Sequence, residues 1–247
     1  MKVAVINFSG NVGKSTVARH LLKPRIPGAE VIMIESINAD EGEQQALRGR
    51  QFGELQEYLQ MTDNVIVDIG ASNVEELLAA MKRYRESHTD FDHFIVPTVP
   101  ALKQQQDTVA TLAELARLGI PAKKVHVLFN MVEDGEDLAQ VFDPVLAFLA
   151  VHPVAEADLA CRMGTNEIYG RIRRTDLDLS TLLADETDYK AAIAAAEGQA
   201  AKLVLAQRLA TRRLAAGVVP DLDDCFAGLR LDYPPYPPAA VRRGRTP

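Results

Sequence analysis

The chain has 247 residues, of which 47% are hydrophobic, and a formal net charge of -7 at pH 7. This length predicts one α/β domain with a sizeable core, and the charge excludes a surface that is basic throughout, so any contact with DNA or membrane would be a local patch. Two cysteines without paired spacing indicate reduced thiols and a cytoplasmic protein. The sequence has no signal-peptide pattern and no run of membrane-spanning length, so we expect no integral membrane segment.

Apolar, β-branched runs alternate with amphipathic stretches over residues 1–155, which we expect to form the core domain. The runs are typical of strands buried on both faces and cover residues 3–8, 31–34, 65–69, 94–96 and 125–129. The helical stretches cover residues 15–22, 44–59, 74–85 and 102–118. This alternation predicts an α/β fold with a doubly wound, mostly parallel sheet, in which ligands bind beyond the carboxyl ends of the strands.

The first strand ends in FSGNVGKST, two glycines followed by a lysine and two hydroxyls. Successive N–H groups in such a loop form an anion site at a helix N-terminus, so the pattern predicts a phosphate-binding loop. We expect Lys14 to reach the outer phosphates and Ser15 to ligate Mg²⁺. The full set of expected nucleotide-binding residues here is Ser9, Gly10, Asn11, Val12, Gly13, Lys14, Ser15 and Thr16. The alternative is that the same residues merely start a helix.

The third strand ends in VIVDIGAS, which places a carboxylate at the same edge of the sheet. Asp68 is therefore a candidate Mg²⁺ ligand, directly or through water. Gly70 would offer its N–H to a γ-phosphate. The alternative for Asp68 is a helix cap or a solvated side chain.

SGNVGKS resembles the deviant loop K-G-G-x-G-K-[ST] of the ParA/MinD-type P-loop ATPases, and residues 68–73 resemble the second switch of that family. The resemblance implies binding of ATP or ADP with Mg²⁺, and a nucleotide-dependent homodimer. In the family the first lysine of the loop contacts the partner's phosphates, whereas this chain has Ser9 there and Asn11 in place of the second glycine. These departures favour nucleotide binding over hydrolysis activated by a partner.

Two further motifs follow from the resemblance. The family carries an Asp-x-Asp pair after the second strand, where this chain has Glu35 and Ile37, so Asp40 is the better candidate to order the attacking water, unless it is a solvated loop residue. The expected catalytic residues are Lys14, Glu35 and Asp40. Asn130, after the fifth strand, matches an asparagine that reads the adenine edge, with an ordinary turn residue as the alternative.

Within the family, the loop and its missing lysine look most like StbB-type plasmid stability proteins. That resemblance implies an ATP-dependent, slowly hydrolysing switch in plasmid partition, plasmid stability or conjugative transfer, working with a plasmid-encoded DNA-binding protein. The alternatives are a nucleotide-binding scaffold without turnover, and a small-molecule ligase or kinase with the same loop.

Beyond residue 155 helical patterning dominates, and we expect a helical extension over 156–230. Its alanine-rich part, 190–216, ends in a basic cluster, Lys202, Arg208, Arg212 and Arg213. Packing on the core or on a second subunit is the simpler interpretation, and a local DNA or membrane-surface patch is the alternative. Residues 231–247, with YPPYPP and three arginines, predict an extended tail, because proline lacks the N–H that a helix needs.

Overall fold

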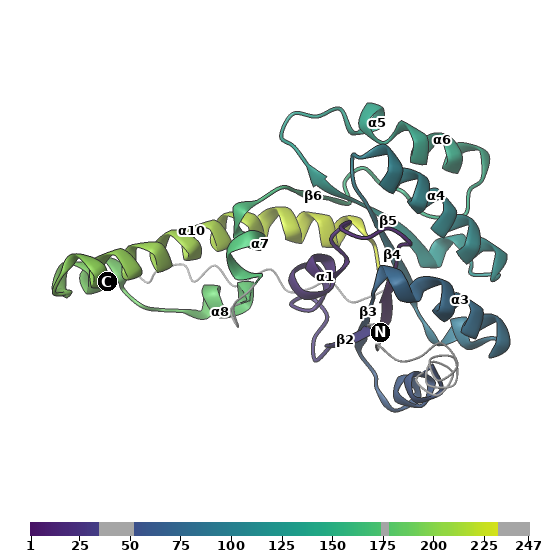
Figure 1. Cartoon of the computed structure of the whole chain (residues 1–247), viewed down its shortest axis with the longest axis horizontal. Coiled ribbons are helices and arrows are strands. Elements are labelled where there is room, and N and C mark those ends of the chain that lie inside the picture. The colour runs from purple at the N-terminus through teal and green to yellow at the C-terminus, as the bar shows by residue number, and fades with distance from the viewer. Residues whose placement is uncertain (35–51, 174–177, 232–247) are drawn as a thin grey trace, which may run out of the picture.

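A computed structural model of the protein describes residues 1–34, 52–173 and 178–231. Within these residues a six-stranded sheet forms the body, and a long helix projects away from it (Figure 1). The strand order is β2-β3-β1-β4-β5-β6, and every neighbouring pair is parallel. The chain reverses its direction of winding at β1, which lies between β3 and β4, so the segment after β1 starts at the edge where ligands bind in such folds.

The strands are short and rich in β-branched residues. They are β1 Lys2–Val5, β2 Glu30–Ile34, β3 Val65–Ile69, β4 His93–Thr98, β5 Val125–Val132 and β6 Arg162–Gly164. The prediction that all strands are buried on both faces is wrong for β2, whose residues are exposed or half-buried because it has only β3 as a neighbour. β1 also ends three residues earlier than predicted.

The helices begin directly after the loop that follows β1. α1 Lys14–Thr16 continues as a π-helix, Val17–Leu22, and residues 52–61 are helical. The others in the body are α3 Val74–Arg83, α4 Leu102–Arg117, α5 Leu138–Val141 and α6 Asp143–Val151. Short 3₁₀ turns precede α3, β4 and β5 at Ala71–Asn73, Ser87–Asp90 and Ala122–Lys124. Of the predicted helix over 44–59, residues 44–51 lie outside the described residues.

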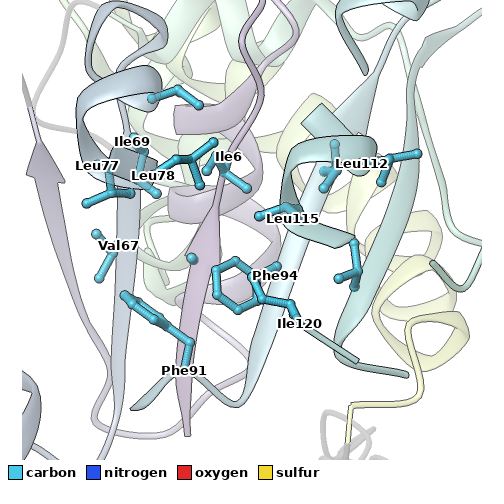
Figure 2. Packing of buried hydrophobic residues seen from close by; sticks show 14 of the residues in the cluster. Ile6, Val67, Ile69, Leu77, Leu78, Phe91, Phe94, Leu112, Leu115 and Ile120 are labelled. Carbon is cyan, nitrogen blue, oxygen red and sulfur yellow. The ribbon is translucent and has the colours of Figure 1, made fainter. Parts of the chain in front are cut away.

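Two apolar clusters cover the two faces of the sheet, as the period-2 alternation of strand side chains requires. One face buries Ile6, Val67 and Phe94 against α3 and α4, and Figure 2 shows Leu77, Leu78, Leu112 and Leu115 closing over them. The other face buries alternate strand residues, such as Val5 and Ile66, against the π-helix and the C-terminal helices. Helices on both faces of a parallel sheet confirm the predicted doubly wound α/β class.

The chain after residue 155 is not wholly helical, because β6 extends the sheet beyond β5. A strand of three residues is too short to produce a recognisable alternation, which explains why the sequence did not indicate it. The helices that follow are α7 Glu167–Ile172, α8 Leu179–Ala184, α9 Tyr189–Ala195 and α10 Gln199–Gly228. The predicted tail lies outside the described residues, apart from Leu231.

α10 has 30 residues and is therefore about 45 Å long. Its second half packs on the sheet through Val218, Leu222 and Cys225, whereas residues 199–214 are exposed or half-buried throughout. Beside this exposed half lies α9, and Figure 1 shows α10 extending away from the sheet. None of the helices in the described ranges combines the length and the apolar character that crossing a membrane requires.

We expect Phe94→Ala to lower the free energy of unfolding by about 3–5 kcal/mol, because the ring is fully buried against Phe91 and its removal leaves a cavity. The control is Leu203→Ala in the exposed half of α10, which we expect to change stability by less than about 0.5 kcal/mol. Urea unfolding followed by circular dichroism measures both. Equal losses for the two variants would contradict this assignment of the core.

Candidate functional site

The start of the loop after β1 is fixed by a buried asparagine. The Nδ2 amide of Asn7 donates to the Pro97 carbonyl at 2.9 Å and to Thr108 Oγ1 at 2.8 Å. Its Oδ1 accepts the N–H of Ser9 at 2.7 Å. Since Pro97 belongs to β4 and Thr108 to α4, one side chain joins the loop to both elements.

Sequence reasoning missed this support. A second threonine of α4, Thr111, accepts the Phe8 N–H at 3.0 Å, so two hydroxyls one turn apart hold the loop entrance. The available signal was Asn7 itself, a polar residue inside an apolar run, because a buried amide needs partners. The threonines gave no signal, since they lie about 100 residues further along the chain.

Of the two glycines in the loop, only Gly13 occupies a position where another residue would be strained. Gly13 has φ +83°, and a Cβ there would lie 2.2 Å from the side-chain nitrogen of Asn130. Gly10 has no such restriction, because nothing in the described part of the chain lies within 4 Å of its Cβ position. Asn11, with φ 59°, adopts the left-handed conformation that asparagine tolerates.

Asn130 supports the same loop. Its Nδ2 donates to the Val12 carbonyl at 2.9 Å, and its Oδ1 accepts the Met131 N–H at 2.9 Å. The side chain is buried, so its first task is to hold the loop against β5. One amide hydrogen and one oxygen lone pair remain for other contacts. The predicted reading of an adenine edge stays a prediction.

Lys14 is the chemically unusual member of the site. Its side chain is 8% exposed and folds back over the loop, donating from Nζ to the carbonyls of Asn7 at 3.1 Å and Ser9 at 2.7 Å. Burial lowers the pKa of this ammonium to about 8, although the nearby carboxylate of Asp68 acts in the opposite direction. A cation held by neutral carbonyls in a buried position favours the approach of an anion.

The predicted metal ligands lie at the same edge of the sheet. Asp68 is the fourth residue of β3, pairs with Val5 at the end of β1, and is 4% exposed. Ser15 is exposed at the start of α1, which packs against β3, and Thr16 is half-buried behind it. The structure therefore brings Lys14, Ser15 and Asp68 to one edge, as parallel strands require. Their roles as phosphate and Mg²⁺ ligands stay predictions.

Gly70 lies against the end of β2. Its N–H donates to the Ile34 carbonyl at 3.0 Å, and the Asn73 Nδ2 donates to the same oxygen at 2.9 Å. For Gly70 to donate to a phosphate, as predicted, its bond to Ile34 would have to break. Glu35 and Asp40, the predicted acids that follow β2, lie outside the described residues.

No protein-family model matches the chain, and no curated protein matches it. Among solved structures, apo McdA from Cyanothece is similar with a TM-score of 0.52 and 14% identity, over 92% of this chain and 97% of that one. MinD from Aquifex aeolicus has a TM-score of 0.48 and 12% identity, over 87% and 97% of the two chains. MinD from Pyrococcus horikoshii, complexed with Mg-ADP, has a TM-score of 0.46 and 14% identity, over 69% and 83%.

These identities establish the fold alone. The similarity to McdA spans nearly the whole of both chains, so the two proteins share a fold, in agreement with the predicted doubly wound α/β class.

We expect Gly13→Ala to destabilise the protein by about 1–3 kcal/mol, because alanine is strained at positive φ and its Cβ would overlap the Asn130 amide. Gly10→Ala is the matched control, with an expected change below about 0.5 kcal/mol. Thermal unfolding of both variants measures the difference. Similar losses at the two glycines would show that the loop does not have this conformation in solution.

The lowered pKa of Lys14 predicts a pH dependence of stability. Between pH 8 and 10.5 the unfolded chain binds more protons at this lysine than the native chain does, so the free energy of unfolding rises with pH in that window. Relative to Lys14→Met, the wild type should gain about 2 kcal/mol between pH 7.5 and 10. Urea unfolding at the two pH values measures this gain, and a difference independent of pH would contradict it.

Proposed function

We propose that this chain is an ATP-binding molecular switch that uses Mg²⁺. The observation that carries the proposal is the buried Lys14 ammonium, held only 2.7 Å and 3.1 Å from two main-chain carbonyls beside the loop that precedes α1. The main-chain carbonyls carry no net charge, so they balance the charge of the buried ammonium only in part. A phosphate bound at the loop would carry the opposite charge and would interact with Lys14 more favourably.

The residues present fit a nucleotide. The loop from Gly10 to Gly13 would bind phosphate oxygens through its N–H groups, and Lys14 would transfer its hydrogen bonds from the loop carbonyls to the outer phosphates. Ser15 and Asp68 would hold Mg²⁺, directly or through water. The bound metal neutralises phosphate charge. ADP would use the same loop, so exchange of ADP for ATP would change what Lys14 and the segment near Gly70 contact.

We propose that hydrolysis is slow. Ser9 occupies the position at which the ParA/MinD-type ATPases have a lysine, and the Ser9 carbonyl already accepts a hydrogen bond from Lys14. No cation at this loop position would therefore reach across a dimer to the partner's phosphates. Glu35, Ile37 and Asp40 provide a different pattern from the family's paired aspartates. These departures from the family pattern also support a second candidate function, a scaffold that binds ATP and does not hydrolyse it.

The biological setting that we propose comes from the resemblance of SGNVGKS to StbB-type proteins. The switch would act in the cytoplasm in plasmid partition, plasmid stability or conjugative transfer, as a nucleotide-dependent homodimer with a plasmid-encoded DNA-binding protein. Contact with DNA would be indirect or through the basic cluster on α10. The clustered arginines of that helix support a local patch in a chain whose overall charge is negative.

Binding of a fluorescent ATP analogue with and without Mg²⁺ tests the proposal. Lys14→Ala should raise Kd more than tenfold, since a charge-assisted phosphate contact contributes on the order of 1.5–3 kcal/mol. Lys190→Ala, an exposed lysine on α9, is the control and should bind like the wild type. GTP serves as competitor, and it should displace the analogue more weakly than ATP does.

Two outcomes separate the candidates. Saturable binding with measurable phosphate release supports the switch, whereas tight binding with no release supports the scaffold. Wild-type protein that does not bind the analogue, or binding that is equal in Lys14→Ala, would overturn both.

A further inference from the structure

Arg25 is a buried cation at the far end of the helix that starts with the phosphate-loop lysine. The π-helix ends at Leu22, and Pro24, two residues further on, has no N–H with which to continue the helical hydrogen bonds. The Arg25 guanidinium replaces the missing donor, because its Nη1 donates to the carbonyls of His20 at 3.1 Å and Leu21 at 3.0 Å. One end of the arginine is thereby fixed to the loop helix.

The remaining donors of Arg25 bind the long helix α10. Nε and Nη2 donate to Asp223 Oδ1 at 2.9 Å and 2.6 Å, and Nη2 also contacts the Val219 carbonyl at 3.4 Å. A guanidinium has five N–H groups, and here each of them has an acceptor. The residue is only 4% exposed, so it is a fully bonded bridge between two helices.

The bridge reaches α10 beside a proline. Pro220 lies inside the helix between the two acceptors, and without an N–H it cannot bind the carbonyl of Ala216. Prolines are the usual positions at which long helices bend. Motion of Arg25 therefore acts on α10 next to a place where the helix is easily bent.

The exposed half of α10 is long enough to turn a small tilt at the bridge into a larger displacement at its tip. From Asp223 to Gln199 the helix runs about 36 Å, so a tilt of about 5° at the bridge displaces its tip by about 3 Å. That exposed half carries Leu203 and Val204, which are 57% and 50% exposed, and the cations Lys202 and Arg208. A small movement at Asp223 thus relocates an apolar and basic surface.

The loop and the bridge belong to one continuous helical segment. The Val17 N–H donates to the Gly13 carbonyl at 2.9 Å, and Lys23 closes an i to i+5 bond to Ala18 at 3.0 Å. Such π-type turns are rare and occur often at functional sites. Ala18 and Leu22 are buried in the same cluster as Leu222 of α10. A displacement of the loop consequently reaches Arg25 through packed helix.

We propose that Arg25 is a positioning residue that couples the nucleotide state of the loop to α10 through Asp223. The coupling rests on the proposed function, since it needs a ligand that changes the loop. Nucleotide binding at Lys14 shifts the helix that ends at Arg25, the guanidinium moves Asp223, and α10 turns about Pro220. The projecting half of α10 is then the element that reports the nucleotide state to a partner.

Hydrogen–deuterium exchange of the full chain with and without Mg-ATP tests this coupling. In the wild type, Mg-ATP should change exchange in residues 215–229 by about threefold or more, because these amides lie at the bridge. Arg25→Met should keep the Kd for the ATP analogue within about threefold and lose the response of α10. Asp223→Asn should lose the same response, and the double variant should lose no more than either single variant.

Arg230→Met is the matched control, because Arg230, just beyond the C-terminal end of α10, forms an exposed ion pair with Asp158 that does not involve the loop helix, and the variant should leave the response intact. If Arg25→Met does not fold, Asp223→Asn carries the test, since the Asp223 side chain is 44% exposed. A response of α10 that persists in variants without the bridge overturns the coupling. So does wild-type protein that binds Mg-ATP with no response in α10, whereas protein that binds no nucleotide overturns the proposed function itself.

Discussion

The burial of one ammonium against two neutral carbonyls is the constraint around which the site is built. Lys14 would be better solvated outside the protein, and burial accordingly lowers its pKa. The fold tolerates this because Asn7 and Ser9 present their carbonyls from a loop with a fixed path. The site therefore holds unfavourable electrostatic free energy that an anionic ligand would relieve, as is typical of functional sites.

Fixing that path requires contacts from much of the body. Asn7 connects the loop to β4 and α4, and Asn130 connects it to β5. The helix after the loop is bound in turn to α10 by Arg25. A change at the loop therefore has a packed route to the C-terminal helices, which share one face of the sheet with the helix that follows the loop. The proposed phosphate binding and the proposed movement of α10 would both depend on this arrangement.

The sequence alone predicted those features that depend on residues close together along the chain. Residues 65–69 were predicted as a strand with the bounds of β3, because an apolar β-branched run identifies a buried strand. Gly13 was located by its position in the loop after the first strand, and Asp68 by its position near the end of the third strand. Contacts between distant polar residues were not predictable: Asn130 bonds to Val12 across 118 positions, and Arg25 to Asp223 across 198. No periodicity records such pairs, since each depends on the completed fold.

The most direct test of the central claim is calorimetric titration of Mg-ATP at pH 8.5 in two buffers with different enthalpies of ionisation. If a phosphate takes over from the carbonyls as the partner of Lys14, its pKa returns upward on binding. At that pH the complex should take up about three quarters of a proton from the buffer. Equal binding enthalpies in the two buffers, with ATP bound, would show that the nucleotide does not contact the buried Lys14 ammonium.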